Sequence, residues 1–329
     1  MLFEVDIQPI PSNLLSDRFL VPPFSILDTK QGYWQDRKRN WINLGIKSEL
    51  GRGDNLTFNL GCFDYDDEKN RQEAKKITTG KCLPESIGEA YGRKVQATSI
   101  FDPVVCEIAY KWFSKDNDKI IDPFAGGSVR GLVAGMLKRH YTGIDLSNKQ
   151  IEANKQQYEE ISKKYSGIME PNWINGDSLN CKELAKDNYN LLFTCPPYYD
   201  LEVYSDKEND LSNMQTYDDF IKVYSEIIKN ACDMLVDNSF AVIVVGNMRN
   251  HKDGGYYDFV GDTVKAFENA GLIYYNEMIL VNVIGTLPVR APKQFNASRK
   301  VGKQHQQVLV FYKGDPNKIK DKFGSFEED

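Results

Sequence analysis

Short apolar strands alternate with longer amphipathic segments from about residue 118 to residue 314, and this alternation constrains the fold most strongly. It is typical of a mostly parallel sheet that helices cover on both faces. The sequence therefore predicts an α/β protein with a seven-stranded sheet. The expected strands are Lys119–Asp122, Tyr141–Asp145, Asn172–Asn175, Tyr189–Phe193, Phe240–Val245, Ile273–Val283 and Gln307–Tyr312.

Apolar residues recur at helical spacing between several of these strands. One stripe runs from Ile151 to Tyr165 and a longer one from Phe220 to Leu235, as expected for helices that face a core. The last two strands have no strong helical pattern between them. We therefore expect them to pair antiparallel at one edge of the sheet.

The rest of the chain has a different character. Residues 1–95 are rich in turns and charges, and we expect an N-terminal extension that packs on the core and is a candidate for target contact. Residues 96–315 would form the sheet domain and 316–329 a C-terminal tail. Of the 329 residues, 41% are hydrophobic, which is enough for a sizeable core.

Composition excludes several classes of protein. No apolar run approaches the roughly 20 residues of a membrane span, and residues 1–6 lack the features of a secretion signal. From these two features we expect a cytoplasmic location. The six cysteines are scattered and form no CxxC pair, so we expect reduced thiols and no metal site. The net charge of −6 requires that any nucleic acid bind through local basic patches.

Small and acidic residues follow the first strand, in the segment 122–131 (DPFAGGSVRG). Small residues let a ligand approach the backbone and the positive end of the next helix. The segment lacks the Gly-Lys-Ser/Thr of a Walker loop and the GxGxxG dinucleotide pattern. Phosphate binding is therefore the weaker hypothesis.

Two further strand ends carry carboxylates. Asp145 follows the glycine turn by about 20 residues, where a carboxylate can accept hydrogen bonds from ribose hydroxyls. Asp177, beside Ser178, can accept from an adenine amino group. Each feature alone has a plain alternative, namely a simple turn, a helix cap or a loop acid. Together they predict one crevice at the carboxyl edge of the sheet.

The fourth strand runs into Thr194-Cys195-Pro196-Pro197-Tyr198. The two prolines stiffen the backbone and remove two amide donors, so a rigid row of carbonyl acceptors remains. An adjacent aromatic ring can stack on a planar base, which is worth roughly 1–3 kcal/mol. The segment suits an amino group attached to a flat ring. A proline-stiffened corner with core tyrosines is the alternative.

These two motifs together resemble the amino-methyltransferase family, whose members methylate adenine N6 or cytosine N4 in DNA. The likeness is closest to phage and prophage DNA methylases and covers nearly the whole chain. Segments that carry it are 22–28 (PPFSILD), 31–37 (QGYWQDR), 99–103 (SIFDP) and 305–313 (HQQVLVFYK). It implies a class I, Rossmann-like methyltransferase fold with 96–315 as the catalytic domain, in the cytoplasm of a bacterium or phage-infected cell.

The resemblance implies S-adenosylmethionine as the cofactor. Phe101 and Asp102 would lie near its methionine end, the glycine turn around its middle, Asp145 on its ribose and Asp177 at its adenine. The full implied set is Phe101, Asp102, Asp122, Pro123, Phe124, Ala125, Gly126, Gly127, Ser128, Asp145, Leu146, Ser147, Asp177 and Ser178.

The resemblance also implies a base flipped out of double-stranded DNA and a direct in-line methyl transfer. Pro196 carbonyl would hold the amino group and Tyr198 would stack on the base. The implied catalytic residues are Thr194, Cys195, Pro196, Pro197 and Tyr198. Most relatives carry Asp, Asn or Ser at position 195, and because a thiol is a weak acceptor, Thr194 or Asp200 is a candidate second acceptor.

Residues 282–305 contain no acid and five basic residues, Arg290, Lys293, Arg299, Lys300 and Lys303. We expect a loop that neutralises DNA phosphates, with a merely solvated loop as the alternative. A second, less clean basic set is Arg37, Lys38, Arg39, Lys47 and Arg52. The glycine-bearing loop 247–257 either closes over the substrate or is a surface turn.

Adenine N6 in DNA is the first choice of acceptor and cytosine N4 the alternative. Methylation of RNA or of a protein amide, and a catalytically silent DNA-binding relative, stay open. A cytosine C5 mechanism with Cys195 as nucleophile is disfavoured, because in that chemistry the cysteine follows a proline and here it precedes two. A homodimer is compatible with the sequence, which does not define the oligomeric state.

Overall fold

A computed structural model describes residues 15–47, 101–199, 209–250, 252–285 and 287–326. Its main sheet has eight strands in the order β1-β9-β10-β6-β5-β2-β3-β4. The strands are β1 (Ile26–Asp28), β2 (Lys119–Asp122), β3 (His140–Asp145), β4 (Asn172–Asn175), β5 (Tyr189–Thr194), β6 (Leu235–Val245), β9 (Ile273–Val281) and β10 (His305–Lys313). All seven expected strands are present, with ends shifted by a few residues.

The sheet is parallel except at β10, which pairs antiparallel with both β6 and β9. The predicted antiparallel pairing of the last two strands is therefore confirmed. The sequence did not indicate β1, which pairs parallel with β9 and forms an eighth, outermost strand. A short hairpin of β7 (Met248–Arg249) and β8 (Tyr256–Tyr257) occupies most of the predicted loop 247–257.

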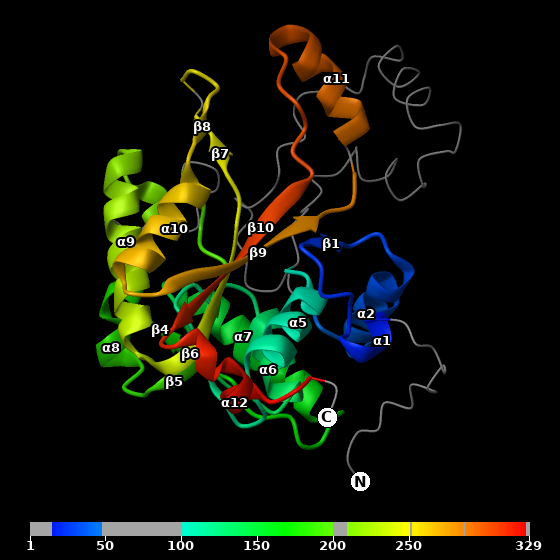
Figure 1. The fold of residues 1–329 in the computed structure, drawn as a ribbon, viewed down its shortest axis with the longest axis vertical. Coiled ribbons are helices and arrows are strands. Elements are labelled where there is room, and N and C mark those ends of the chain that lie inside the picture. Colours follow the sequence, from blue (N-terminus) through cyan, green and yellow to red (C-terminus); the bar gives the residue numbers. More distant parts are fainter. Residues whose placement is uncertain (1–14, 48–100, 200–208, 251, 286, 327–329) are drawn as a thin grey trace.

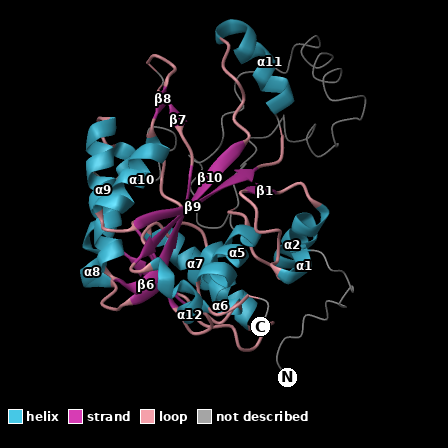
Figure 2. Cartoon of the chain, in the orientation of Figure 1, coloured by secondary structure: helices cyan, strands magenta, loops and turns pink. Residues whose placement is uncertain are grey.

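Helices cover both faces of the sheet (Figures 1 and 2). Alternate strand residues point to opposite faces, so Leu191 and Phe193 enter one core while Leu192 enters the other. The first core lies under α2 (Gly32–Asn43), α5 (Pro103–Phe113), α6 (Val129–Met136) and α7 (Asn148–Ser162). The second lies under α8 (Cys181–Leu184), α9 (Tyr217–Asp233) and α10 (Phe259–Asn269). Two short helices are α1 (Leu15–Arg18) and α12 (Ile319–Phe323).

One element contradicts the expectation of a loop between the last two strands. Residues Leu287–Ser298 form helix α11. Pro288 lies in the first turn, where a missing N–H costs nothing, but Pro292 lies inside the helix. Two prolines and the neighbouring glycines made the segment resemble a loop.

None of the helices in the described ranges is both long and apolar enough to span a bilayer.

Close packing around α6 leads to a stability prediction. A Cβ built on Gly135 would lie 2.2 Å from the Met169 carbonyl oxygen, and a backbone atom cannot rotate away. Gly135→Ala should therefore lower the free energy of unfolding by roughly 1–3 kcal/mol or more, as overpacked sites do. Gly32→Ala is the matched control, because a Cβ there has no neighbour within 4 Å. Equal urea midpoints for the two variants would contradict this packing.

Candidate active site

A cavity of about 1030 Å³ opens at the carboxyl edge of the sheet. It is lined by Phe101 and Asp102, by the glycine turn, by the Asp145 and Asp177 strand ends and by the double-proline corner. The predicted residues in its wall are Phe101, Asp102, Pro123, Phe124, Gly126, Gly127, Asp145, Leu146, Ser147, Asp177, Ser178, Cys195, Pro196, Pro197 and Tyr198. The glycine turn and the double-proline corner thus border one space, as the sequence predicts.

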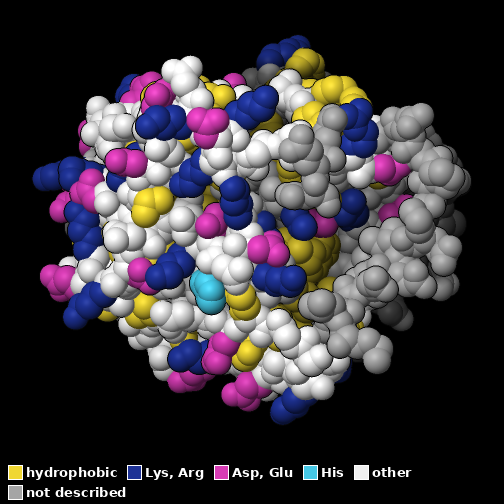
Figure 3. All heavy atoms as spheres, turned by 60° about the horizontal axis from the view of Figure 1, so that its bottom comes forward, with side chains coloured by type: hydrophobic (Ala, Val, Ile, Leu, Met, Phe, Trp, Pro, Cys, Tyr) yellow, Lys and Arg dark blue, Asp and Glu magenta, His cyan; other side chains and the backbone are white. Residues whose placement is uncertain are grey.

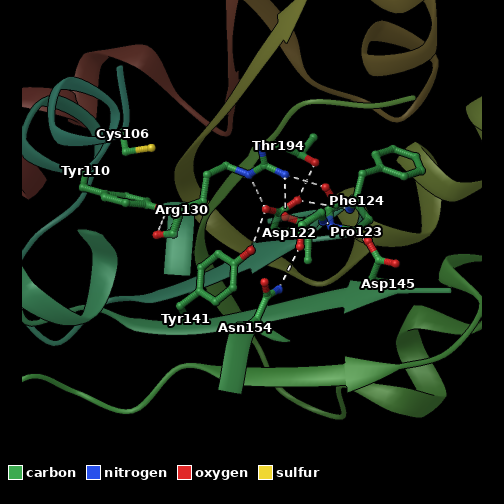
Figure 4. A network of polar contacts seen from close by, with 12 residues as sticks. Cys106, Tyr110, Asp122, Pro123, Phe124, Arg130, Tyr141, Asp145, Asn154 and Thr194 are labelled. Carbon is green, nitrogen blue, oxygen red and sulfur yellow. Dashed lines mark hydrogen bonds and ion pairs between the residues drawn. The ribbon is translucent and has the colours of Figure 1, made fainter. Parts of the chain in front are cut away.

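Four predicted residues, Asp122, Ala125, Ser128 and Thr194, are buried and do not line this cavity. Asp122 is completely inaccessible and lies beneath the glycine turn (Figure 4). Ser128 instead hydrogen-bonds Gln157 of α7. These residues support the site from below.

Asp122 is the centre of a buried polar network. Its carboxylate accepts hydrogen bonds from Arg130 Nε at 2.6 Å and from the Tyr141 hydroxyl at 2.7 Å. It also accepts from the Thr194 hydroxyl at 2.6 Å and from the backbone N–H of Phe124 at 3.1 Å. One side chain therefore joins strands β2, β3 and β5 to the glycine turn.

Arg130 carries this network to the cavity wall. Its Nη2 donates to the carbonyl oxygens of Phe124 and Ala125, and its guanidinium lies 4.7 Å from the centroid of the Phe101 ring. Burial by itself would lower the pKa of Arg130. The Asp122 charge, its hydrogen bond to Arg130 and the smaller effects of Tyr141 and Cys195 together outweigh burial and hold the pKa above its ordinary value. The charged Arg130 side chain therefore holds the glycine turn in place. Segment 122–131 contains Arg130, but the sequence alone indicated no role for it.

Asp145 holds the glycine turn from the other side. One carboxylate oxygen accepts from the N–H of Gly126 at 2.9 Å and the other from the N–H of Ser147 at 2.8 Å. Gly126 adopts a φ of +51°, which favours glycine. Burial raises the pKa of Asp145 despite these two donors. Each oxygen retains acceptor capacity, since a carboxylate offers about four lone-pair sites.

The Asp177 strand end is a cap as well as part of the wall. Its carboxylate accepts from the N–H of Leu179 at 3.0 Å and caps a short 3-10 turn, while its other oxygen accepts from the Asn209 amide at 2.7 Å. The Ser178 hydroxyl donates to the carbonyl of Pro123. Asp177, for which the sequence offered a plain loop acid as the alternative, thus both caps a turn and lines the cavity.

The double-proline corner is built from two layers. Cys195, Pro196 and Pro197 line the cavity, whereas the Thr194 hydroxyl is directed to Asp122. The buried Thr194 hydroxyl therefore bonds Asp122 below the cavity wall and is not positioned to accept a hydrogen from the target amino group. Asp200, the other candidate, lies outside the described residues.

The Tyr198 ring is fixed by two neighbours. It packs edge-on against Phe259 with centroids 5.9 Å apart, and its hydroxyl accepts from Gln306 Nε2 at 3.1 Å. Gln306 belongs to β10 and also lines the cavity. Sequence reasoning missed Gln306, although the quoted segment 305–313 contains it.

The five basic residues of 282–305 do not form one cluster in the structure. Lys293 is exposed on α11, while the Lys300 ammonium lies against Gly254 of the β7–β8 hairpin. Arg299 follows α11 with a φ of +58° and its guanidinium lies 5.3 Å from the Phe295 ring centroid. Arg290 lies in α11, and its side chain is outside the described part.

Lys303 points into the cavity. Its ammonium donates to the carbonyl of Asn247 at 2.9 Å, and a Cβ built on Gly246 would be 2.6 Å from it. Burial lowers the pKa of Lys303 to about 8. This lysine therefore belongs to the wall opposite the glycine turn.

The first comparison with known proteins concerns the carboxyl-terminal part of the chain. Residues 189–326 match the N6_N4_Mtase family, described as DNA methylase. This match confirms the resemblance to amino-methyltransferases over less than half of the chain. A curated relative, the type II methyltransferase M.HinfI from Haemophilus influenzae, is 28% identical over 109 residues. That alignment covers 32% of this chain and 29% of the relative, so the chain spans less than a third of that protein's length.

Solved methyltransferase structures also resemble the chain. TrmN from Thermus thermophilus gives a TM-score of 0.43 at 11% identity, over 65% of this chain and 49% of TrmN. An rRNA methylase from Streptococcus thermophilus gives 0.41 at 13% identity, over 66% of this chain and all of that protein. The strand order, with β10 antiparallel between β6 and β9, is that of the predicted class I methyltransferase fold.

The family match supports S-adenosylmethionine as the cofactor, and the cavity fits that molecule. Asp145 offers buried acceptor capacity beside a glycine turn that lets a ligand approach the backbone. Asp177 lies at the next strand end and Asp102 at the opposite side of the turn. The cavity therefore offers carboxylate acceptors at three places in its wall, Asp102, Asp145 and Asp177.

The buried network predicts a large loss of stability when its centre is removed. Asp122→Ala leaves the Arg130 charge unpaired in the interior and should lower the free energy of unfolding by about 3–5 kcal/mol. Thr194→Val removes one hydrogen bond of the same network and should cost about 1 kcal/mol. Urea unfolding of both variants measures the difference. Similar losses for the two would show that Asp122 is not the centre.

Lys303 should titrate near pH 8. Its ¹³Cε resonance, assigned through its loss in Lys303→Arg, should move around pH 8. Because the folded protein releases this proton at lower pH than the unfolded chain, the free energy of unfolding should rise from about pH 8 toward the ordinary lysine pKa. A resonance that stays constant between about pH 7 and pH 9 would contradict this placement.

Proposed function

We propose that this protein transfers a methyl group from S-adenosylmethionine to the exocyclic amino group of a base in DNA, with adenine N6 preferred over cytosine N4. One observation carries the proposal. The Asp145-anchored glycine turn and the Cys195-Pro196-Pro197-Tyr198 corner line a single cavity. A methyl donor on one wall and an amino group on the other can then meet within that space.

The chain's own residues supply binding and orientation. Asp145 would accept from the ribose hydroxyls and Asp177 from the adenine amino group, while Arg130 keeps the neighbouring glycine turn in place. The cofactor supplies an electrophilic sulfonium methyl group when it is bound. Positioning of both partners is the main source of acceleration in such a direct transfer.

The double-proline corner receives the target base. The Pro196 carbonyl accepts a hydrogen from the amino group and so orients its nitrogen. Tyr198 offers a ring that Phe259 and Gln306 already hold in position, so little side-chain entropy is lost when a base stacks on it. Cys195 lines the same wall, but its thiol is a weak acceptor. The hydrogen bond from the amino group to the Pro196 carbonyl therefore mainly determines how the amino group is oriented.

Two structural arms reach beyond the cavity from the same end of the molecule, the β7–β8 hairpin and α11 (Figure 1). The hairpin carries Arg249 and Lys252, α11 carries Lys293, and Lys300, which follows α11, lies against the hairpin at Gly254. Elsewhere, the face drawn in Figure 3 mixes basic and acidic side chains among its described residues. DNA phosphates would therefore bind at the arms rather than over the surface in general.

Nucleoside analysis tests the proposal. The protein is incubated with unmodified double-stranded DNA and S-adenosylmethionine, and the digested DNA is analysed by mass spectrometry. N6-methyladenine is expected, and N4-methylcytosine would assign the alternative acceptor. Tyr198→Ala should lower kcat/KM about 10-fold or more because stacking is worth roughly 1–3 kcal/mol. Tyr198→Phe keeps the ring, loses the hydroxyl contact with Gln306 and should retain most of the activity.

Parallel incubations with RNA and with protein substrates serve as controls. Methylation confined to either of these would overturn the DNA assignment. A wild-type protein that binds DNA but methylates no substrate would show a catalytically silent relative.

A further inference from the structure

A cation without a carboxylate partner among the described residues lies in the cavity wall. The Lys303 ammonium donates to the carbonyl oxygen of Asn247 at 2.9 Å, which is its one hydrogen bond within the described part of the chain. Burial is the cause of its lowered pKa. Because an ammonium has three donors, two are available to a molecule in the cavity.

The ammonium lies beside the ring that is proposed to stack on the target base. A Cβ built on Gly246 would lie 2.6 Å from Lys303 Nζ and 3.7 Å from the Tyr198 hydroxyl, so these groups come together just after β6. Gln306 completes the corner through its hydrogen bond of 3.1 Å to the Tyr198 hydroxyl. All four residues line the cavity.

The position of Lys303 costs stability rather than supplying it. Its ammonium is partly desolvated and has no counter-charge in the described ranges, which disfavours the charged form. A methionine of similar length has no charge to desolvate. The fold alone therefore does not explain a lysine here, and a partly buried, perturbed cation in a cavity wall indicates a ligand with an acceptor.

The surroundings of Lys303 favour a neutral acceptor over a phosphate. Lys293 is exposed on α11, where it can bind a phosphate that stays in solvent. Lys303 is instead half-buried, beside the ring on which a flipped base would stack. Adenine carries ring nitrogens N1, N3 and N7 at its edges, and each can accept a hydrogen bond.

We propose that the Lys303 ammonium donates a hydrogen bond to a ring nitrogen of the flipped target base. This inference rests on the proposed function. Stacking on Tyr198 would fix the plane of the base, and the Pro196 carbonyl would hold its amino group at one point. One such point leaves the base free to turn within its plane. A second contact, from Lys303 to the ring, stops that rotation and keeps the amino nitrogen in line with the methyl donor.

Deaza analogues of adenine test the contact atom by atom. In 1-, 3- and 7-deazaadenine a C–H group replaces one ring nitrogen, and the amino group stays. Each analogue replaces the target adenine in a duplex that the wild-type protein methylates, and kcat/KM is measured. If the target is cytosine, 3-deazacytosine takes the place of these analogues.

The expected result is a coupling between Lys303 and one ring nitrogen. Lys303→Met should lower kcat/KM on adenine about 10-fold or more, the loss expected for a charge-assisted hydrogen bond. On the analogue that lacks the contacted nitrogen, Lys303→Met should cause no further loss relative to the wild type, because the contact is already absent. The ratio of the two effects removes the influence of the analogue on the chemistry itself.

Lys293→Met is the matched control. It removes the same charge from an exposed position that does not line the cavity. It should lower kcat/KM by one common factor on adenine and on all analogues, and added salt should reduce this effect. The melting temperature supplies a second readout. Lys303→Met should leave it unchanged or raise it, because a desolvated cation is removed, whereas a purely structural lysine would lower it.

The outcomes separate this inference from the proposed function. If Lys303→Met has no effect on adenine, or the same effect on adenine and every analogue, Lys303 does not bind the ring, while methyl transfer to DNA stands. Loss of the Lys303→Met effect when a neutral methylphosphonate flanks the target would assign the ammonium to a phosphate and refute the base contact. A wild-type protein that methylates no DNA would overturn the proposed function and this inference together.

Discussion

The buried ion pair between Asp122 and Arg130 is the interaction on which the site depends. Charges are costly to bury unless they are paired and their remaining hydrogen-bonding capacity is used. Here Tyr141 of β3, Thr194 of β5 and backbone groups of the glycine turn satisfy the pair from two strands and one loop. The network fixes the relative positions of the two strand ends that border the cavity.

The same network explains why the motifs combine residues of two kinds. Some line the cavity, such as Asp145 and Pro196, and can touch a ligand. Others, such as Asp122 and Thr194, have no access to it and hold the first kind in place. The sequence motif does not distinguish cavity-lining residues from buried supporting residues, because both occur at the same strand ends.

The sequence predicted the central fold well because its signals are local. Strand and helix periodicity marked seven strands, and the rule that parallel strands end at one edge placed their loops together. Predictions were weakest where local signals were short or mixed. The three-residue strand β1 has too little pattern to stand out, and the prolines of α11 masked a helix.

What the sequence alone determined is the set of strand ends and the small, acidic and proline residues placed on them, since these follow from spacing along the chain. Only the tertiary structure decided which side chains meet there. Lys38 reaches the cavity from a separate helix, Lys303 turns inward, and Arg130 grips the glycine turn. Contacts of the first two kinds join residues more than 50 positions apart, and long-range packing chooses such partners rather than local periodicity.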